Sequence, residues 1–366
     1  MLKLLDEGAD VKLKDPVGNS CLHYAVVCGN YESIRHLVMY GADLEQENIR
    51  NGYKPIHLCL SENKEKCLEE LLKHGAQVNA VDSSKNTLLH LVLKFTPKDL
   101  DFIEKLLNYG FDPNITNITG NNCLHIIAAS RSCTATESLL LAKKFIKKGV
   151  DIDHVNNATG ETPLQMASRT GKIHLVDLLL REGAAMDVRS HLGFTAFERL
   201  FFGNRPKIDI VAIFIKHIAL KKHRGETVQD SVSQKIASDA ILRAIYRSYD
   251  EDLNRLKSIE IVETHWVTLH HILCRKKSDV INYLRSTSVR DNILSQEVST
   301  IYRKEIWHKV SELVKIVIFQ EVSCRVVDEV LDGRLPYLCV EQISKYLSEN
   351  EVKELYSLLL KSENID

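Results

Sequence analysis

The sequence predicts an all-α protein in three consecutive parts: a solenoid of stacked helical repeats over residues 1–220, a polar linker over 221–235 and a small helical bundle over 236–366. Two observations predict the solenoid. Glycines recur 33 to 39 residues apart through the first half, and apolar residues three and four positions apart precede them, as in an amphipathic helix. The helical pattern continues after residue 235 without that period, which predicts the bundle. The recurring glycines are Gly8, Gly41, Gly75, Gly110, Gly149 and Gly183.

A second fixed feature of each repeat is a short motif that precedes most of these glycines. It starts with Gly or Asn and ends with His or Gln, and its copies lie at 18–23, 52–57, 86–90, 120–125 and 160–165. A helical pattern follows each copy, for example Leu175, Val176, Leu179 and Leu180. We expect each of these helices to end at the recurring glycine, where a left-handed backbone costs least.

This unit resembles the ankyrin repeat, whose pattern is Gly-x-Thr-Pro-Leu-His-x-Ala followed by two antiparallel helices and a β-turn. The copy at 160–167 fits best and differs only at Gln165, which replaces the histidine. The resemblance covers residues 1–220 and implies a solenoid that binds other proteins. It also implies that the recurring histidine braces one repeat against the next. A zinc site would need four ligands converging on one point, and no repeat carries two such histidines.

Several repeats depart from this pattern. Lys85 stands where the third motif should have its glycine, and the fourth repeat is stretched at 130–136, between its two helices. A sixth unit at 193–198 keeps only part of the motif, as terminal repeats often do. Residues 1–10 resemble the second helix of a repeat whose first helix is missing. Either this is an unusual cap or the chain is a fragment of a longer protein, and both alternatives stay open.

Composition narrows the classes of partner and reaction that we expect. Lys and Arg number 48 and Asp and Glu number 49, so we expect neither nucleic acid nor membrane as a partner. No apolar run approaches 20 residues. Nine cysteines, an odd number, indicate a reducing compartment, which is the cytoplasm or alternatively the nucleus. The sequence contains no phosphate-binding loop, catalytic motif or metal-binding motif, so we expect no enzymatic activity, cofactor or metal.

The second half ends in a segment, 335–352, that resembles the start of an F-box. It departs from the F-box at Leu338 and Cys339, which replace a Glu-Ile pair, and at Ser344. Ankyrin repeats followed by such a segment resemble the PRANC architecture of poxvirus ankyrin proteins, which implies docking of residues 335–360 on the Skp-type adaptor of a cullin ubiquitin ligase. The alternative is a helical hairpin that closes the bundle. The implied adaptor contacts are Leu335, Pro336, Ile343, Tyr346, Leu347 and Val352.

These features favour a protein-binding adaptor that holds a target on its repeats and recruits a ubiquitin ligase with its C-terminal segment. The rival hypothesis is a stoichiometric ankyrin-type inhibitor that masks a signalling protein without a ligase, and a third is a scaffold within a larger chain. In the ankyrin family, contacts lie on the β-turn tips and the first helices. The tip residues predicted to bind the target are Val17, Asn19, Asn51, Tyr53, Asn86, Thr119, Asn121, Glu161 and Phe194.

Overall fold

The computed structural model describes residues 6–97, 99–202, 207–258 and 268–275, and the single residues 280, 302, 306, 309, 310 and 313. It divides the chain into two compact units, Met1–Phe214 and Ile215–Asp366. Each unit is described by itself below. None of the helices in the described part of the chain is both long and apolar enough to cross a membrane.

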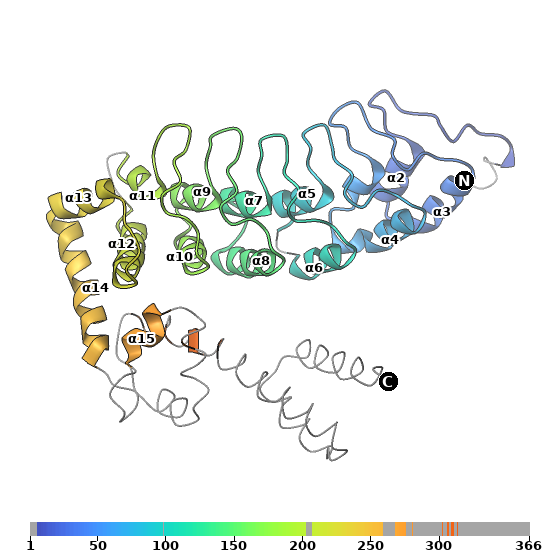
Figure 1. Ribbon diagram of the computed structural model, residues 1–366. Coiled ribbons are helices and arrows are strands. Elements are labelled where there is room, and N and C mark those ends of the chain that lie inside the picture. The colour runs from blue at the N-terminus through green and yellow to red at the C-terminus, as the bar shows by residue number, and fades with distance from the viewer. Residues whose placement is uncertain are drawn as a thin grey trace, which may run out of the picture. The chain divides into compact units, whose positions relative to one another are not determined.

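The first unit is a stack of helix pairs in which the first helix of each repeat forms an inner row and the second an outer row, with a long loop projecting between successive repeats (Figure 1). Inner helices pack on inner helices and outer on outer, as α7 does on α9 and α3 on α4. This confirms the predicted ankyrin solenoid. The inner row is α2 (Cys21–Val27), the 3₁₀ helix η1 (Pro55–Leu58), α5 (Leu88–Phe95), α7 (Cys123–Ala129), α9 (Pro163–Thr170) and α11 (Ala196–Arg199); the outer row is α3 (Tyr31–Met39), α4 (Glu65–Lys73), α6 (Leu100–Asn108), α8 (Ala135–Lys147) and α10 (Ile173–Arg181).

The repeat motif explains where the inner helices begin. In α9 the hydroxyl of Thr162 accepts from the amide of Gln165 at 3.3 Å, and the Gln165 side chain accepts from the amide of Thr162 at 2.8 Å. This reciprocal cap satisfies two amides that a helix start leaves free. Pro163 takes the first helical position, where a missing N–H costs nothing.

The leucine of the motif builds the inner core. Leu22, Ile56, Leu89, Leu124 and Leu164 occupy the same place in five successive repeats, and each is at most 1% exposed. Burial of one such side chain stabilises the fold by roughly 1.5–3 kcal/mol. The same position therefore contributes to the core in every layer of the stack.

The histidine of the motif links neighbouring repeats, as predicted. In each case ring atom Nε2 bonds a backbone carbonyl in the segment that leads into or forms the next motif. The carbonyl acceptors are Tyr53 for His23 (2.8 Å), Ala80 for His57 (3.0 Å), Asn121 for His90 (3.2 Å) and Glu161 for His125 (3.0 Å). In the fifth repeat, the side-chain amide of Gln165 donates to the carbonyls of Val188 at 2.9 Å and Phe194 at 3.0 Å, so it keeps the linking role.

Two local differences from the sequence prediction lie in the repeats. The first helix of the second repeat is only the 3₁₀ turn η1 that Pro55 begins. Lys85 stands in place of the motif glycine and still adopts the left-handed conformation, with φ 58°. The recurring glycines at the ends of the outer helices are left-handed as expected, with φ between 79° and 93°.

The second unit contains the end of α12 (Ile208–His223), then α13 (Asp230–Ser238), α14 (Ala240–Ser258) and α15 (Leu269–Cys274). Residues 221–235, predicted as a linker, thus carry a helix end and most of α13, because Val232 and Ile236 are buried. Helix α14 packs on α13 and α15. The core of this unit contains Leu253, Leu256, Leu269, Ile272 and Tyr302 among others, whereas Ile241 is 63% exposed. The segment 335–360 lies outside the described residues.

Candidate interaction surface

The first five loops between repeats each fold into a tight turn that one side-chain oxygen organises. In the first loop, Asp15 Oδ1 accepts from the amides of Val17 at 2.9 Å and Asn19 at 2.7 Å. In the fourth, Asn117 Oδ1 accepts from the amides of Thr119 and Asn121, both at 3.1 Å. Short Asp and Asn side chains favour such turns because they reach backbone amides two residues on. These five tips are therefore built on the same kind of turn.

The tips also bond to one another along the stack. The backbone amide of one tip donates to a carbonyl of the preceding tip, as Ile49 does to Val17 at 2.8 Å and Ile118 does to Ser84 at 2.8 Å. Side-chain amides form a parallel ladder, in which Asn156 Nδ2 donates to Asn121 Oδ1 at 2.9 Å. The row of tips is consequently one continuous hydrogen-bonded surface.

At Gly120 and Gly160, two tips approach so closely that only glycine fits. A Cβ placed on Gly120 would lie 2.6 Å from the backbone nitrogen of Asn157, and one on Gly160 would lie 2.7 Å from that of His191. Real Cβ atoms essentially never approach so closely. Both glycines also have positive φ, 75° and 67°. The motif glycine thus serves close approach as well as turn geometry.

The predicted target-binding residues differ in how far they are exposed to solvent. Val17 is exposed, at 40%. Asn51, Tyr53, Thr119 and Phe194 are half-buried. Three more are half-buried and bonded within the side-chain ladder: Asn48 Nδ2 donates to Asn19 Oδ1, Asn117 Nδ2 to Asn86 Oδ1, and Asn156 Nδ2 to Asn121 Oδ1.

Glu161 is buried, whereas a residue that binds a target protein has to be exposed. Its side chain is buried, at 5% exposure, and pairs with Arg169 Nε at 3.1 Å. The physical reason is that the position after the motif glycine faces the inner helix of the same repeat, where Arg169 of α9 supplies the counter-charge.

Sequence reasoning missed three strongly exposed aliphatic residues at the tips. Ile49 is 80% exposed, Leu192 64% and Ile118 57%. Ile49 and Ile118 follow the ladder asparagines Asn48 and Asn117 directly. A usable signal was present, because a branched apolar side chain beside the turn glycine has no neighbour to cover it at a loop tip. With Val17, these residues form what we call the tip row: Val17, Ile49, Ile118 and Leu192.

Two tip carboxylates, those of Asp15 and Asp82, form hydrogen bonds within their own turns. The Tyr24 hydroxyl donates to Asp15 Oδ2 at 2.8 Å and, with Asn19, holds the pKa of that carboxyl at about 2. Asp82 is buried and accepts from the amides of Ser84 and Asn86. By contrast, the tip cations Arg50 and Lys85 are exposed, and neither forms an ion pair with any residue that the structure describes.

The six predicted adaptor-contact residues, Leu335, Pro336, Ile343, Tyr346, Leu347 and Val352, all lie outside the described residues. Within the described part of the chain, no three His, Cys, Asp or Glu side chains gather as metal ligands would.

Comparison with known proteins places the first half in a family. A family model described as ankyrin repeats matches residues 1–82 and 88–190. The chain is 27% identical to the nuclear factor NF-kappa-B p105 subunit of Gallus gallus over 179 residues, which cover 47% of this chain and 18% of that protein. It is 26% identical to the ankyrin repeat protein FPV031 of fowlpox virus (strain NVSL) over 285 residues, 73% of this chain and 82% of that one.

Among solved structures, the ankyrin repeat domain of Bcl-3, a member of the IkappaB protein family, aligns with a TM-score of 0.48 and 22% identity, covering 58% of this chain and 89% of that domain. The chain spans less than a fifth of the chicken protein but most of the fowlpox one. The family model, by contrast, covers half of the chain itself. The chain therefore belongs to the ankyrin-repeat family, whose members present a stacked surface to other proteins.

Proposed function

We propose that this protein is a non-enzymatic adaptor whose tip row binds a target protein and whose segment 335–360 recruits a Skp-type adaptor and its cullin ubiquitin ligase. The tip row carries the first half of this proposal. It places four aliphatic side chains in water on a surface fixed by hydrogen bonds, and exposed apolar groups on a rigid surface are what a protein partner covers.

Support for ligase recruitment comes from the F-box-like sequence at 335–352. The similarity to the fowlpox ankyrin repeat protein covers 73% of the chain, more than the repeats alone, so it extends into the second half. An exposed edge of Ile343 and Leu347 would offer an adaptor a few kcal/mol of apolar burial, at roughly 1.5–3 kcal/mol for each side chain.

A stoichiometric inhibitor is the second candidate, and the similarity to an NF-kappa-B subunit favours it. In this version the repeats mask a signalling protein and no ligase is needed. For both candidates we place the protein in a reducing compartment, the cytoplasm or the nucleus. The seven cysteines that the structure describes as free are consistent with that placement.

Pull-down of purified Skp-type adaptor with the full chain separates the two candidates. The adaptor proposal expects binding that is lost in Ile343→Asp or Leu347→Asp and kept in a tip-row variant. If intact chain retains no adaptor under low-salt conditions, recruitment is refuted. If residues 1–220 alone keep full activity in cells, the inhibitor version is favoured instead.

The tip row is tested separately by capturing the target from cytosol with Ile49→Asp and Leu192→Asp variants. Each removes an exposed anchor, and loss of an anchor of this kind weakens binding by more than 1 kcal/mol, or at least about fivefold. Met39→Asp is the matched control, because Met39 is 73% exposed but lies on the outer helix α3. Equal retention by all three variants would exclude the tip row as the binding surface.

A further inference from the structure

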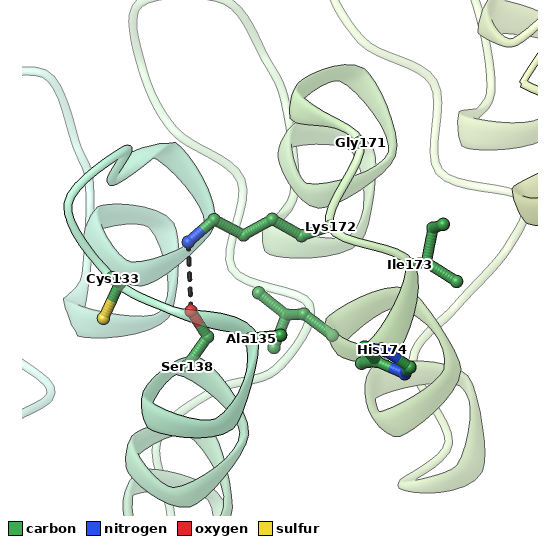
Figure 2. Close-up of a pocket in the computed structure, with 8 residues that line it drawn as sticks. Cys133, Ala135, Ser138, Gly171, Lys172, Ile173 and His174 are labelled. Carbon is green, nitrogen blue, oxygen red and sulfur yellow. Dashed lines mark hydrogen bonds between the residues drawn. The ribbon is translucent and has the colours of Figure 1, made fainter.

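A cavity of about 230 Å³ opens between the fourth and fifth repeats, away from the loop tips. Figure 2 shows its lining residues, which come from the connection 130–134, the start of α8, the connection 171–172 and the start of α10. Its wall includes Cys133, Ala135, Ser138, Lys172, Ile173, His174 and Leu175.

The stretched fourth repeat borders this space. The connection from α9 to α10 is residues 171–172 and that from α2 to α3 is residues 28–30, but α7 connects to α8 through residues 130–134. The longer connection supplies Cys133, and Ala135 begins the helix that follows it. The cavity thus coincides with a departure from the repeat pattern, whereas shorter connections join the helices directly.

Lys172 supplies the charge in the cavity wall. Its ammonium Nζ donates to the carbonyl of Ile127 at 2.8 Å and to Ser138 Oγ at 3.0 Å, as the dashed line in Figure 2 shows for Ser138. Lysines cap inner helices elsewhere in the stack: Lys64 Nζ donates to the carbonyls of Val26 and Val27 at 2.9 and 2.7 Å. Lys64 bonds two carbonyls at a helix end, whereas Lys172 bonds one carbonyl and also lines an open cavity.

The charge around the cavity is uncompensated. No carboxylate lines it, and both acceptors of Lys172 are neutral. A second ammonium, that of Lys207, lies so near Gly171 in the wall that a Cβ there would meet it at 3.0 Å. Glu137, in the first turn of α8, accepts from the amide of Thr134 and thereby caps that helix. Lys172 therefore bonds only neutral acceptors among the described residues, and burial lowers its pKa.

We propose that this cavity binds a carboxylate carried on a small apolar group, with Lys172 as the ion-pair donor and Ala135, Ile173 and Leu175 in contact with the apolar part. The ammonium of Lys172 has three N–H groups. Two of them bond the neutral acceptors, so one is left for the carboxylate. The volume suits a body of about eight non-hydrogen atoms, if each takes the ~30 Å³ of a liquid water. Hexanoate has that size.

The test is a titration of the full chain with hexanoate, followed by NMR of the labelled methyl groups of Ala135, Ile173 and Leu175. These methyls are expected to shift along a saturable curve, while those of Ile34 in α3 stay unchanged. Hexanamide, with the same size and no charge, is expected to bind at least about tenfold more weakly, since hydrogen bonds to charged groups contribute about twice as much as neutral ones. Equal binding of acid and amide, or methyls that do not respond, overturns the proposal.

Two pairs of variants localise the effect. Lys172→Gln is expected to weaken hexanoate binding about tenfold or more, and Lys64→Gln, which removes the comparable cap at α2, is expected to leave it unchanged. Ala135→Trp fills the mouth of the cavity from an exposed position and should abolish binding, whereas Thr136→Trp one position on should not. If Lys172→Gln fails to fold, the tryptophan pair still decides; equal hexanoate affinity in both tryptophan variants overturns the proposal.

The carboxylate could come from a free acid or from the C-terminus of a bound protein, and peptides distinguish the two. A tetrapeptide ending in leucine with a free carboxylate is compared with hexanoate and with its own C-terminal amide. Tighter binding of the free-carboxylate peptide assigns the site to a protein terminus, and tighter binding of hexanoate assigns it to a free acid. A peptide amide that binds as well as the peptide acid contradicts the proposal.

Discussion

Replacement of the motif glycine at one loop tip should destabilise the stack far more than replacement of a helix-end glycine with similar backbone geometry. Gly120 has φ 75° and Gly149 has φ 79°, so alanine suffers similar left-handed strain at either position, about 1–2 kcal/mol. The surroundings differ. A Cβ on Gly120 meets the Asn157 nitrogen at 2.6 Å, whereas a Cβ on Gly149 meets nothing within 4 Å.

The additional cost at Gly120 can be worked from the contacts that must separate. Relief of the clash moves the tips apart and breaks the bond from the Asn157 amide to the Thr119 carbonyl at 2.9 Å, and it strains the neighbouring bond from Asn156 to Asn121. Each such bond is worth about 1 kcal/mol. We therefore expect Gly120→Ala to lower the free energy of unfolding by about 3 kcal/mol and Gly149→Ala by about 1 kcal/mol.

Urea denaturation of the full chain, followed by far-UV circular dichroism, measures both variants against the parent. The informative quantity is the difference between them, because the left-handed strain cancels. If Gly120→Ala costs no more than Gly149→Ala, the tips do not pack as described, and the continuous hydrogen-bonded surface on which the target proposal rests is refuted.

Three further outcomes are expected. Burial lowers the pKa of His125 from 6.5 to about 4, so the unfolded chain binds this proton at a higher pH than the folded chain does. The free energy of unfolding is therefore highest above pH 6.5 and falls by up to about 3 kcal/mol towards pH 4. Denaturation across that pH range measures the fall, and a flat profile would contradict a neutral buried ring. Lys85→Gly should raise the free energy of unfolding by up to about 1 kcal/mol, because it relieves a left-handed lysine at φ 58°, and a loss of stability in the same urea assay would disprove this reading. Burial raises the pKa of the Cys59 and Cys123 thiols, so mass spectrometry after brief alkylation of the native chain should find them unmodified while exposed Cys28 reacts; rapid labelling of either buried thiol would place it outside the core.

The repeat architecture was predictable because every level of the sequence repeats with it. The motif residue Thr162 caps its helix, Leu164 fills the core, and the histidine or Gln165 bonds the next repeat, so local and global preferences agree. The reduced helix η1 was not predictable in the same way. Its motif differs little from the others, so the motif did not show that only a four-residue 3₁₀ turn forms there.

The candidate surface was predictable in place but not in its residues. The repeat period located the loop tips. The residue types in the tips did not show that Asn19, Asn86 and Asn121 would bond to the next repeat. Glu161 illustrates the same limit, since its carboxylate turns inward to Arg169. Both outcomes depend on partners that lie in another repeat or on another helix.

The helical stack, its period, the glycine turns and the linking role of the histidines could all be predicted from the amino-acid sequence. The reason is that each follows from residues within one repeat and its immediate neighbour. Three features became visible only in the folded protein. They are the exposure of the tip side chains, the pairing of carboxylates such as Glu161 within the fold, and the cavity beside Lys172 next to the connection 130–134. The cavity depends on how separate repeats pack, and the Glu161–Arg169 pair depends on how a tip folds against its own helix, so the spacing of residues along the sequence does not show either.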